Sequence, residues 1–136
     1  MRKPISVELR KIVVARAQYC CEYCRLKEVL SFYNFHVDHI KSVKHDGLTI
    51  ASNLAYSCPD CNHFKGSDIG SFFDNDEQIA RFYNPRKDKW AEHFELVDGA
   101  IYGKTEIGKA TERIFKFNDT DRLIFRRQLM TLNLYP

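Results

Sequence analysis

Residues 54–66 read LAYSCPDCNHFKG, and this stretch decides the fold. Its first three residues predict a short strand, and residues 62–65 predict a short helix that ends at Gly66. Between the two stand Cys58 and Cys61, in a CxxC spacing that turns two sulfurs toward one metal ion. We therefore expect a strand, a metal-binding turn and a helix in immediate succession.

A second CxxC pair, Cys21 and Cys24, precedes this stretch. The start of the chain is too interrupted by charges to hold a signal-peptide core, so we expect a reducing cytoplasm, where disulfides are rare. Two CxxC pairs then favour a structural zinc ion held by four thiolates, from Cys21, Cys24, Cys58 and Cys61. The fifth cysteine, Cys20, would need a longer turn to reach the ion, and we predict that it is a free, buried thiol.

Length and composition set the class of protein. A chain of 136 residues with 44% hydrophobic and 29% charged residues is typical of one globular domain, residues 1–136. No apolar run approaches the ~20 residues of a membrane span. The net charge of +3 permits a nucleic-acid partner without requiring one. Basic residues gather near the first helix and in residues 81–89, which fits phosphate binding. The sequence leaves the oligomeric state open.

Hydrophobic periodicity predicts further elements around the cysteine pairs. Residues 5–19 predict a helix whose apolar stripe is Ile5, Leu9, Ile12, Val13 and Ala17. Residues 35–40 alternate like a strand, and residues 41–53 predict a loop with a turn at Asp46-Gly47. Together these elements form an expected core over residues 5–70.

The rest of the chain, residues 71–136, predicts an extension that packs on this core. Asp98-Gly99 between two apolar runs predicts a β-hairpin over residues 94–102. Thr105 predicts the cap of a helix whose apolar stripe is Ile107, Ala110, Ile114 and Phe117, and residues 118–121 predict another cap before a final helix. In the final helix we expect Phe125, Leu129 and Leu132 to share an apolar face, with Arg122, Arg126 and Arg127 on the polar side. The predicted fold class is α+β.

A set of polar residues lies between and after the cysteine pairs. Asp38-His39 ends the predicted strand, Asn53 precedes the second strand, and Asn62 follows the last cysteine. The order CxxC, Asp-His, Asn, CxxC-Asn-x-x-Lys resembles the HNH endonuclease family, which has a ββα-metal fold, also called the His-Me finger. Weaker similarity to small stand-alone members extends over Asn84-Pro85-Arg86 and residues 90–94.

The resemblance implies an enzyme that hydrolyses DNA and leaves 3′-hydroxyl and 5′-phosphate ends. Asp38 and Asn62 would hold a catalytic Mg²⁺ or Mn²⁺ through oxygen atoms, since hard oxygen ligands suit these ions. His39 would act as the general base, because an imidazole titrates near neutral pH. Asn53 would hold the loop and the His39 backbone in place.

Several alternatives stay open at this point. His63 competes with Asn62 for the metal, and His36 lies on the Asp38 side of an ideal strand, facing substrate or supporting the site. Lys65 would meet a phosphate or face solvent. Strict strand alternation would also separate Asp38 from His39, unless the strand ends or bulges there. RNA is an alternative substrate, and a non-catalytic zinc module that binds nucleic acid is the alternative function.

Overall fold

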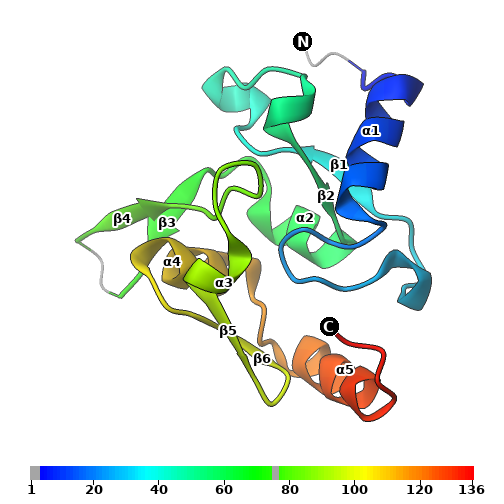
Figure 1. Cartoon of the computed structure of the whole chain (residues 1–136). Coiled ribbons are helices and arrows are strands. Elements are labelled where there is room, and N and C mark those ends of the chain that lie inside the picture. The colour runs from blue at the N-terminus through cyan, green and yellow to red at the C-terminus, as the bar shows by residue number, and fades with distance from the viewer. Residues whose placement is uncertain (1–3, 75–76) are drawn as a thin grey trace. The chain divides into compact units, whose positions relative to one another are not determined.

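The computed structural model describes residues 4–74 and 77–136 of the chain (Figure 1). These residues form short antiparallel strand pairs and five α-helices, so the fold is of the mixed α and β class that the sequence predicts. The chain divides into two compact units, Met1–Ile69 and Gly70–Pro136, and we describe each by itself. That residues 71–136 pack on the core stays a prediction.

The first unit opens with α1, Val7–Ala17. Ser6 caps this helix, because its hydroxyl accepts a hydrogen bond from the Leu9 amide at 3.1 Å. The buried face consists of Val13 and Val14, which pack toward β2. The predicted stripe is therefore wrong at Ile12, whose side chain is 52% exposed. A helix this exposed needs only a narrow apolar contact, so its sequence pattern is a weak guide to the buried face.

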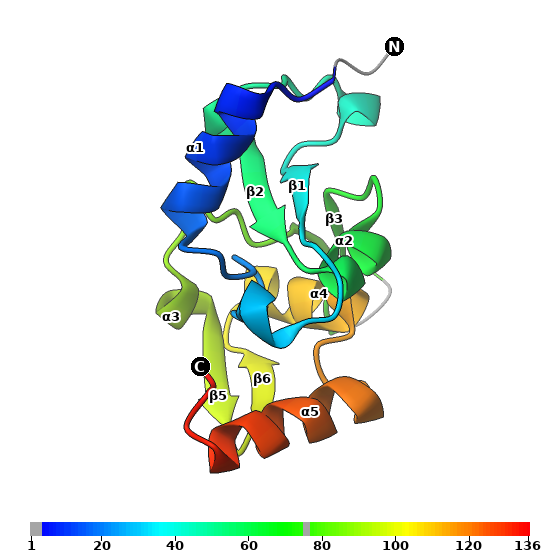
Figure 2. The same cartoon turned by 90° about the vertical axis from the view of Figure 1, so that its right-hand side faces the viewer.

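Two strands and a helix form the centre of this unit. The strand β1, His36–His39, pairs antiparallel with β2, Leu54–Ser57, with Asp38 opposite Ala55. The helix α2, Pro59–Lys65, follows β2 directly and ends at Gly66, whose φ of 53° suits glycine. Figure 2 shows α1 beside β2 and α2 beyond the strand pair. This strand–strand–helix order is a ββα-metal arrangement.

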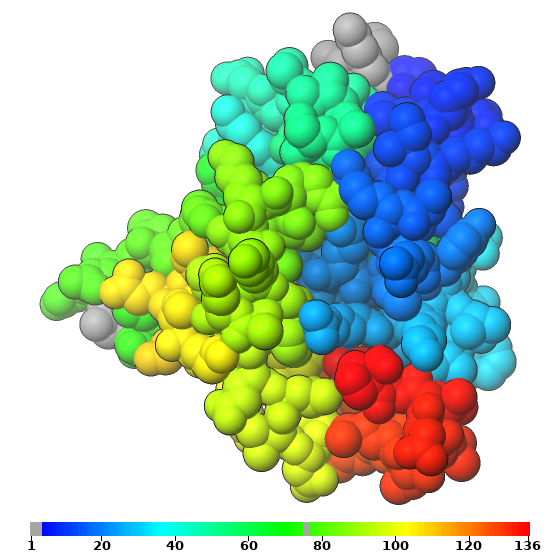
Figure 3. All heavy atoms as spheres, in the orientation of Figure 1, coloured from blue at the N-terminus to red at the C-terminus, as the bar shows by residue number. Residues whose placement is uncertain are grey.

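The connections of the first unit carry three short 3₁₀ helices. They are η1, Glu28–Leu30, η2, Val43–His45, and η3, Ala51–Asn53. The loop after β1 is tight at Gly47, where a Cβ atom would lie 1.6 Å from the Lys41 carbonyl oxygen. Only glycine fits that approach. The segment between the first cysteine pair and β1 lies at the surface, in the lighter blue of Figure 3.

In its described residues, 70–74 and 77–136, the second unit has two strand pairs and three helices. Its elements are β3, Gly70–Phe72; β4, Ile79–Arg81; α3, Trp90–His93; β5, Phe94–Val97; β6, Ala100–Gly103; α4, Glu106–Phe115; and α5, Thr120–Thr131. β3 pairs with β4 and β5 with β6, both antiparallel. The predicted hairpin is confirmed, with φ of 50° at Asp98 and 83° at Gly99, as a tight two-residue turn requires. The β3–β4 pair was not predicted.

The core of the second unit is aromatic. Phe94, Phe115 and Phe117 are each no more than 2% exposed, and the Phe117 ring contacts each of the other two edge to face. The prediction that Arg126 lies on the polar side of the final helix is wrong, because this side chain is only 3% exposed. Its guanidinium donates to the carbonyl oxygens of Gly99, at 2.7 Å, and of Phe117, and thereby joins α5 to the hairpin turn. Backbone carbonyls can satisfy a buried arginine, and sequence periodicity does not show them.

None of the helices among the described residues has the length and apolar character that a bilayer crossing requires.

Candidate functional site

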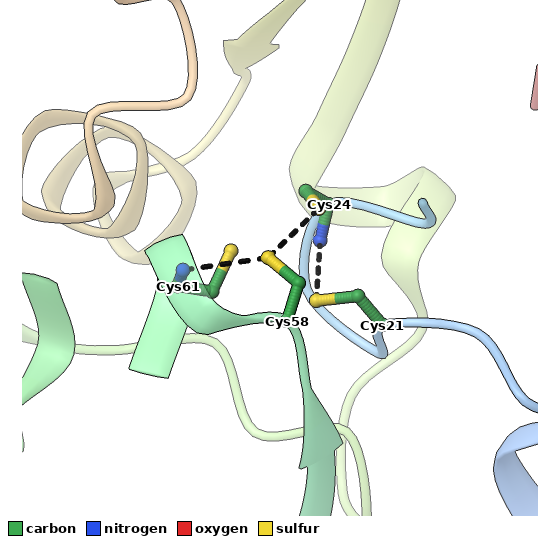
Figure 4. Close-up of side chains that lie close together, drawn as sticks. All are labelled: Cys21, Cys24, Cys58 and Cys61. Carbon is green, nitrogen blue, oxygen red and sulfur yellow. Dashed lines mark hydrogen bonds between the residues drawn. The ribbon is translucent and has the colours of Figure 1, made fainter. Parts of the chain in front are cut away.

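The four cysteines of the two CxxC pairs meet in one buried cluster (Figure 4). Cys21 and Cys24 come from the loop after α1, and Cys58 and Cys61 come from the start of α2. Their sulfur atoms all lie within 4.8 Å of one another, and each residue is at most 2% exposed. The pairs are far apart in sequence, and folding brings them together.

The geometry of the cluster fits a tetrahedral metal ion. Four sulfurs about 2.3 Å from one ion stand about 3.8 Å apart, and Sγ of Cys24 lies 3.7 Å from Sγ of Cys58. In each pair the amide of the second cysteine points at the sulfur of the first, at 3.5 Å for Cys24 and 3.4 Å for Cys61. Such amide contacts stabilise thiolate sulfurs. The four cysteines can therefore hold a metal ion.

Without a cation, the closeness of the four sulfur atoms disfavours their ionised thiolate forms. Hydrogen bonds with the Cys21 and Cys24 thiols raise the pKa of Cys58 well above its usual value. Burial, followed by the same neighbours, raises the pKa of Cys61. Four sulfur anions this close together need a positive charge between them, which a divalent ion supplies.

Glu22, inside the first CxxC turn, fastens this turn to β2. Its amide donates to the carbonyl oxygen of Tyr56 at 2.9 Å, and its carboxylate accepts from the Tyr56 amide at 2.9 Å. A second glutamate, Glu28, accepts from the Tyr56 hydroxyl at 2.7 Å. Burial and this hydrogen bond raise the pKa of Tyr56. The cysteine cluster and the strand pair are thus one connected structure.

Cys20 stands apart from the cluster. Its backbone forms an isolated bridge with Lys27, and its thiol donates to the Gln18 carbonyl oxygen at 3.4 Å. The side chain is half-buried instead of fully buried as predicted. Burial raises the pKa of Cys20, so it is a poor thiolate at neutral pH.

A cavity of about 360 Å³ lies in the first unit beside β1 and α2. Its walls bring together residues from β1, the η2 loop and α2, which are His36, Val37, Asp38, His39, Ser42, Val43, Lys44, Asn62, Gly66 and Ser67. Asp38 and His39 line the same cavity although they are neighbours in a strand. His39 is the last residue of β1, and the alternation of the strand need not hold at its end.

Asp38 is 7% exposed and lies next to the buried ammonium group of Lys65. Lys65 Nζ is 3.0 Å from Asp38 Oδ2, but among the described residues Oδ2 has no partner with hydrogen-bond geometry. The ammonium instead donates to the His39 carbonyl oxygen at 2.7 Å. Lys65 is 1% exposed, so it neither meets solvent nor presents its charge at the surface. The Lys65 ammonium thus holds the Asp38 carboxylate and the His39 backbone in position.

His39 is 2% exposed and has a defined partner in the loop that follows β1. Its Nε2 lies 2.8 Å from Thr49 Oγ1. When Nε2 carries the proton and donates to this hydroxyl, Nδ1 is the basic nitrogen of the neutral ring. Thr49 therefore fixes the orientation of the His39 ring.

Asn53 closes the loop between β1 and β2. Its amide nitrogen donates to the carbonyl oxygens of Lys41, at 3.0 Å, and Leu48, at 2.8 Å, and its side-chain oxygen accepts from the Lys41 amide at 2.9 Å. Its own carbonyl oxygen accepts from the Ile40 amide, directly after His39, at 2.8 Å. These contacts restrain both ends of the loop, and none of them brings the Asn53 side chain to the cavity.

The two candidates on α2 differ in position. Asn62 lines the cavity with Asp38 and His39, whereas His63 is exposed, does not line it and contacts the ring of Phe64. Neighbouring helix residues differ by about 100°, so only one can face β1. His36 is exposed and lines the cavity mouth.

Sequence reasoning missed two contributors to this site, Thr49 and Lys44. Thr49 and Lys44 stand in a loop without periodicity, so no pattern marks their orientation. Lys65 was singled out, but its inward direction follows from the packing of α2 on β1, which a motif does not reveal.

Comparison with known proteins agrees with this architecture. The HNH endonuclease family model matches residues 21–68, which span both cysteine pairs and the cavity. The chain therefore carries a domain of the HNH endonuclease family. The family implies a nuclease-type function on nucleic acid with a divalent metal.

A particular relative is the curated Septu protein PtuB of Bacillus thuringiensis, which is 30% identical over 128 residues. The match covers 93% of this chain and 46% of the relative, so the chain spans about half the length of that protein. No solved structure matches the chain significantly.

Proposed function

We propose that this protein is a metal-dependent endonuclease that hydrolyses DNA phosphodiester bonds. The observation that carries the proposal is the shared cavity, where a carboxylate, an imidazole and an amide come together beside the cysteine cluster. Its roughly 360 Å³ is sufficient for a phosphate group and water. Structural zinc held by the four cysteines would keep β2 and α2 in place.

Asp38 and Asn62 are the proposed ligands of a catalytic Mg²⁺ or Mn²⁺. Asp38 Oδ2 is buried and lies 3.0 Å from the Lys65 ammonium, but it has no partner with hydrogen-bond geometry among the described residues, so this oxygen can still bind a cation. A carboxylate and an amide carbonyl are hard oxygen donors that suit these two ions. When bound, such an ion supplies positive charge to the phosphate and to the departing oxygen.

His39 is the proposed general base. With Nε2–H donated to Thr49, Nδ1 takes the proton from the attacking water. Lys65 holds the His39 carbonyl and balances the Asp38 charge, so the base and the proposed ligand keep a fixed separation. Asn53 restrains the loop that carries Thr49.

The basic residues around the cavity fit a phosphate-bearing substrate. Lys44 and His36 are exposed and line its wall, so they are the proposed contacts to the DNA backbone. We place the protein in the reducing cytoplasm, because thiolates bind zinc there without competing oxidation.

The test is plasmid cleavage by the purified full chain. Cleavage should occur with Mg²⁺ or Mn²⁺, stop with chelator, and fall roughly 10²–10⁴-fold in His39→Ala, the usual effect of a positioned base. The zinc content and melting temperature of His39→Ala should match the parent. Asp38→Ala should also lose cleavage, with partial rescue by excess Mg²⁺ that His39→Ala does not show.

The same assay separates the alternatives. Cleavage by His39→Ala at the parental rate would refute the assigned base. A parent that binds DNA but does not cleave it with any of the divalent ions tested would instead favour the non-catalytic zinc module. Fastest cleavage with Zn²⁺ or Ni²⁺ would point to an imidazole ligand, and His36 lines the same cavity.

A further inference from the structure

Two neighbouring aromatic side chains stand out on the first unit, in a loop that we call the aromatic loop, residues 31–35. Phe32 is 102% exposed and Tyr33 is 73% exposed, and Val29 just before them is 85% exposed. By contrast Phe35, the last residue of the loop, is 2% exposed and packs on Tyr56. The core therefore includes Phe35 and leaves the rings of Phe32 and Tyr33 in water. Exposed apolar rings lower the solubility of a protein unless a binding partner covers them.

The exposed charges of the connection that carries the aromatic loop have one sign. Glu22 and Glu28 turn inward, where Glu22 accepts from the Tyr56 amide and Glu28 accepts from the Phe35 amide at 2.7 Å. The exposed charged residues between the first cysteine pair and β1 are Arg25 and Lys27. The surface thus combines flat apolar rings with cations, a composition that suits an anionic partner with flat faces.

The aromatic loop leads directly into the candidate site. Phe32 precedes His36, a residue of the cavity wall, by four positions, so the two Cα atoms lie within about 14 Å even for a fully extended chain. Duplex DNA rises about 3.4 Å per base step. A phosphate in the cavity would therefore have neighbouring nucleotides within reach of Phe32 and Tyr33.

We propose that Phe32 and Tyr33 stack against unpaired bases of the nucleic acid whose phosphate enters the cavity. The inference rests on the proposed function and adds a substrate feature to it, namely single-stranded or locally opened DNA. Every base has a π-face, so stacking is independent of sequence. Arg25 and Lys27 are exposed in the same connection between the first cysteine pair and β1, and they provide phosphate attraction.

The test measures binding separately from cleavage. In a His39→Ala background, the zinc-loaded full chain is titrated with a fluorescent single-stranded oligonucleotide and with the matching duplex. One base stacked on an aromatic ring changes affinity by roughly 5- to 150-fold. Phe32→Ala/Tyr33→Ala should therefore weaken single-strand binding at least about tenfold and duplex binding less. The dependence on salt should stay unchanged, because no phosphate contact is removed.

Matched variants distinguish stacking from apolar docking. Phe32→Trp/Tyr33→Trp should bind the single strand like the parent, and Phe32→Leu/Tyr33→Leu should bind as weakly as the alanine pair. Parental affinity for the single strand in the leucine or alanine pair would overturn the proposal.

The outcome is separable from that of the proposed function. Plasmid cleavage with unchanged oligonucleotide binding in the alanine pair refutes stacking alone. Ring-dependent binding by a parent that does not cleave DNA with any divalent ion refutes the nuclease function and leaves the stacking proposal standing.

Discussion

Lys65 Nζ lies 3.0 Å from Asp38 Oδ2, and both side chains are buried, at 1% and 10% exposure. The same ammonium donates to the carbonyl oxygen of His39. One cation on α2 thus contacts both residues that the proposed reaction places at the centre of the site. It compensates the buried carboxylate, whose isolated charge would be costly away from water.

Lys65→Met should destabilise the fold by about 3–5 kcal/mol, because it leaves a buried carboxylate without its counter-charge. The measurement is the free energy of unfolding by chemical denaturation. Added Mg²⁺ should raise the melting temperature of this variant more than that of the parent, since a divalent ion can replace the lost cation.

The control for Lys65 is the double variant Asp38→Asn/Lys65→Met. It removes both charges and should be more stable than Lys65→Met alone, since no uncompensated ion remains. If Lys65→Met unfolds at the parental denaturant concentration, the ion pair does not contribute as described.

Cys58→Ser should lose the bound zinc, about one ion per chain in the parent, and should destabilise the fold. Metal-binding free energy is part of folding free energy when ligands come from distant segments. Cys20→Ser is the matched control, since Cys20 lies outside the cluster and should keep full zinc content. Elemental analysis and thermal unfolding measure both effects, and a folded, zinc-free parent would contradict the assignment.

Thr49→Val should reduce cleavage by roughly tenfold, the lower end of effects seen when a histidine loses its orienting partner. Valine keeps the shape of threonine but removes the hydroxyl that holds Nε2 of His39. Thr49→Ser keeps the hydroxyl and should cleave near the parental rate. Equal rates for the valine and serine variants would show that Thr49 does not act through His39.

Lys44→Ala should weaken DNA binding about equally for all sequences. The slope of the logarithm of the binding constant against the logarithm of the salt concentration should fall in magnitude by about one. Lys44 is exposed on the cavity wall, so the reason is the loss of one phosphate contact. Lys44→Arg keeps the charge and should retain the parental slope. Titrations at several salt concentrations provide the slope. An unchanged slope in Lys44→Ala would show that Lys44 does not contact a DNA phosphate.

The ion pair between Asp88 and Arg81 in the second unit makes the stability of the fold depend on pH in the acid range. The guanidinium donates to both carboxylate oxygens at 2.8 Å and holds the pKa of Asp88 below its ordinary value of 3.8. A lowered folded pKa contributes stability above about pH 4 and loses it as pH falls through the folded value. Asp88→Asn should therefore cost roughly 1 kcal/mol at pH 7, because Arg81 is half-exposed.

The measurement for Asp88 is the difference in unfolding free energy between parent and variant at each pH. Acid-induced loss of zinc affects both proteins and cancels in the difference. The difference should shrink toward pH 3, and a constant difference would contradict the ion-pair origin.

Local sequence determined the parts of this protein that depend on short-range geometry. The two CxxC pairs predicted a four-cysteine cluster, because the spacing itself turns two sulfurs to one side. Asp98-Gly99 predicted the hairpin, since few residues adopt positive φ at both turn positions. Thr105 predicted a cap, which the Gly108 amide confirms at 3.0 Å. The Asp-His, Asn and Asn pattern predicted candidates, and their roles stay predictions.

Only the tertiary structure decided which side chains face each other. Lys65 and Arg126 are long cations that a sequence places on the surface, yet both are buried on backbone carbonyls that come from other elements. Thr49 becomes the partner of His39 because Asn53 folds the intervening loop back on β1. Local propensity acts over a few residues, whereas these contacts join segments separated along the chain. Their orientation therefore follows from packing and from the strong tendency of buried polar groups to find partners.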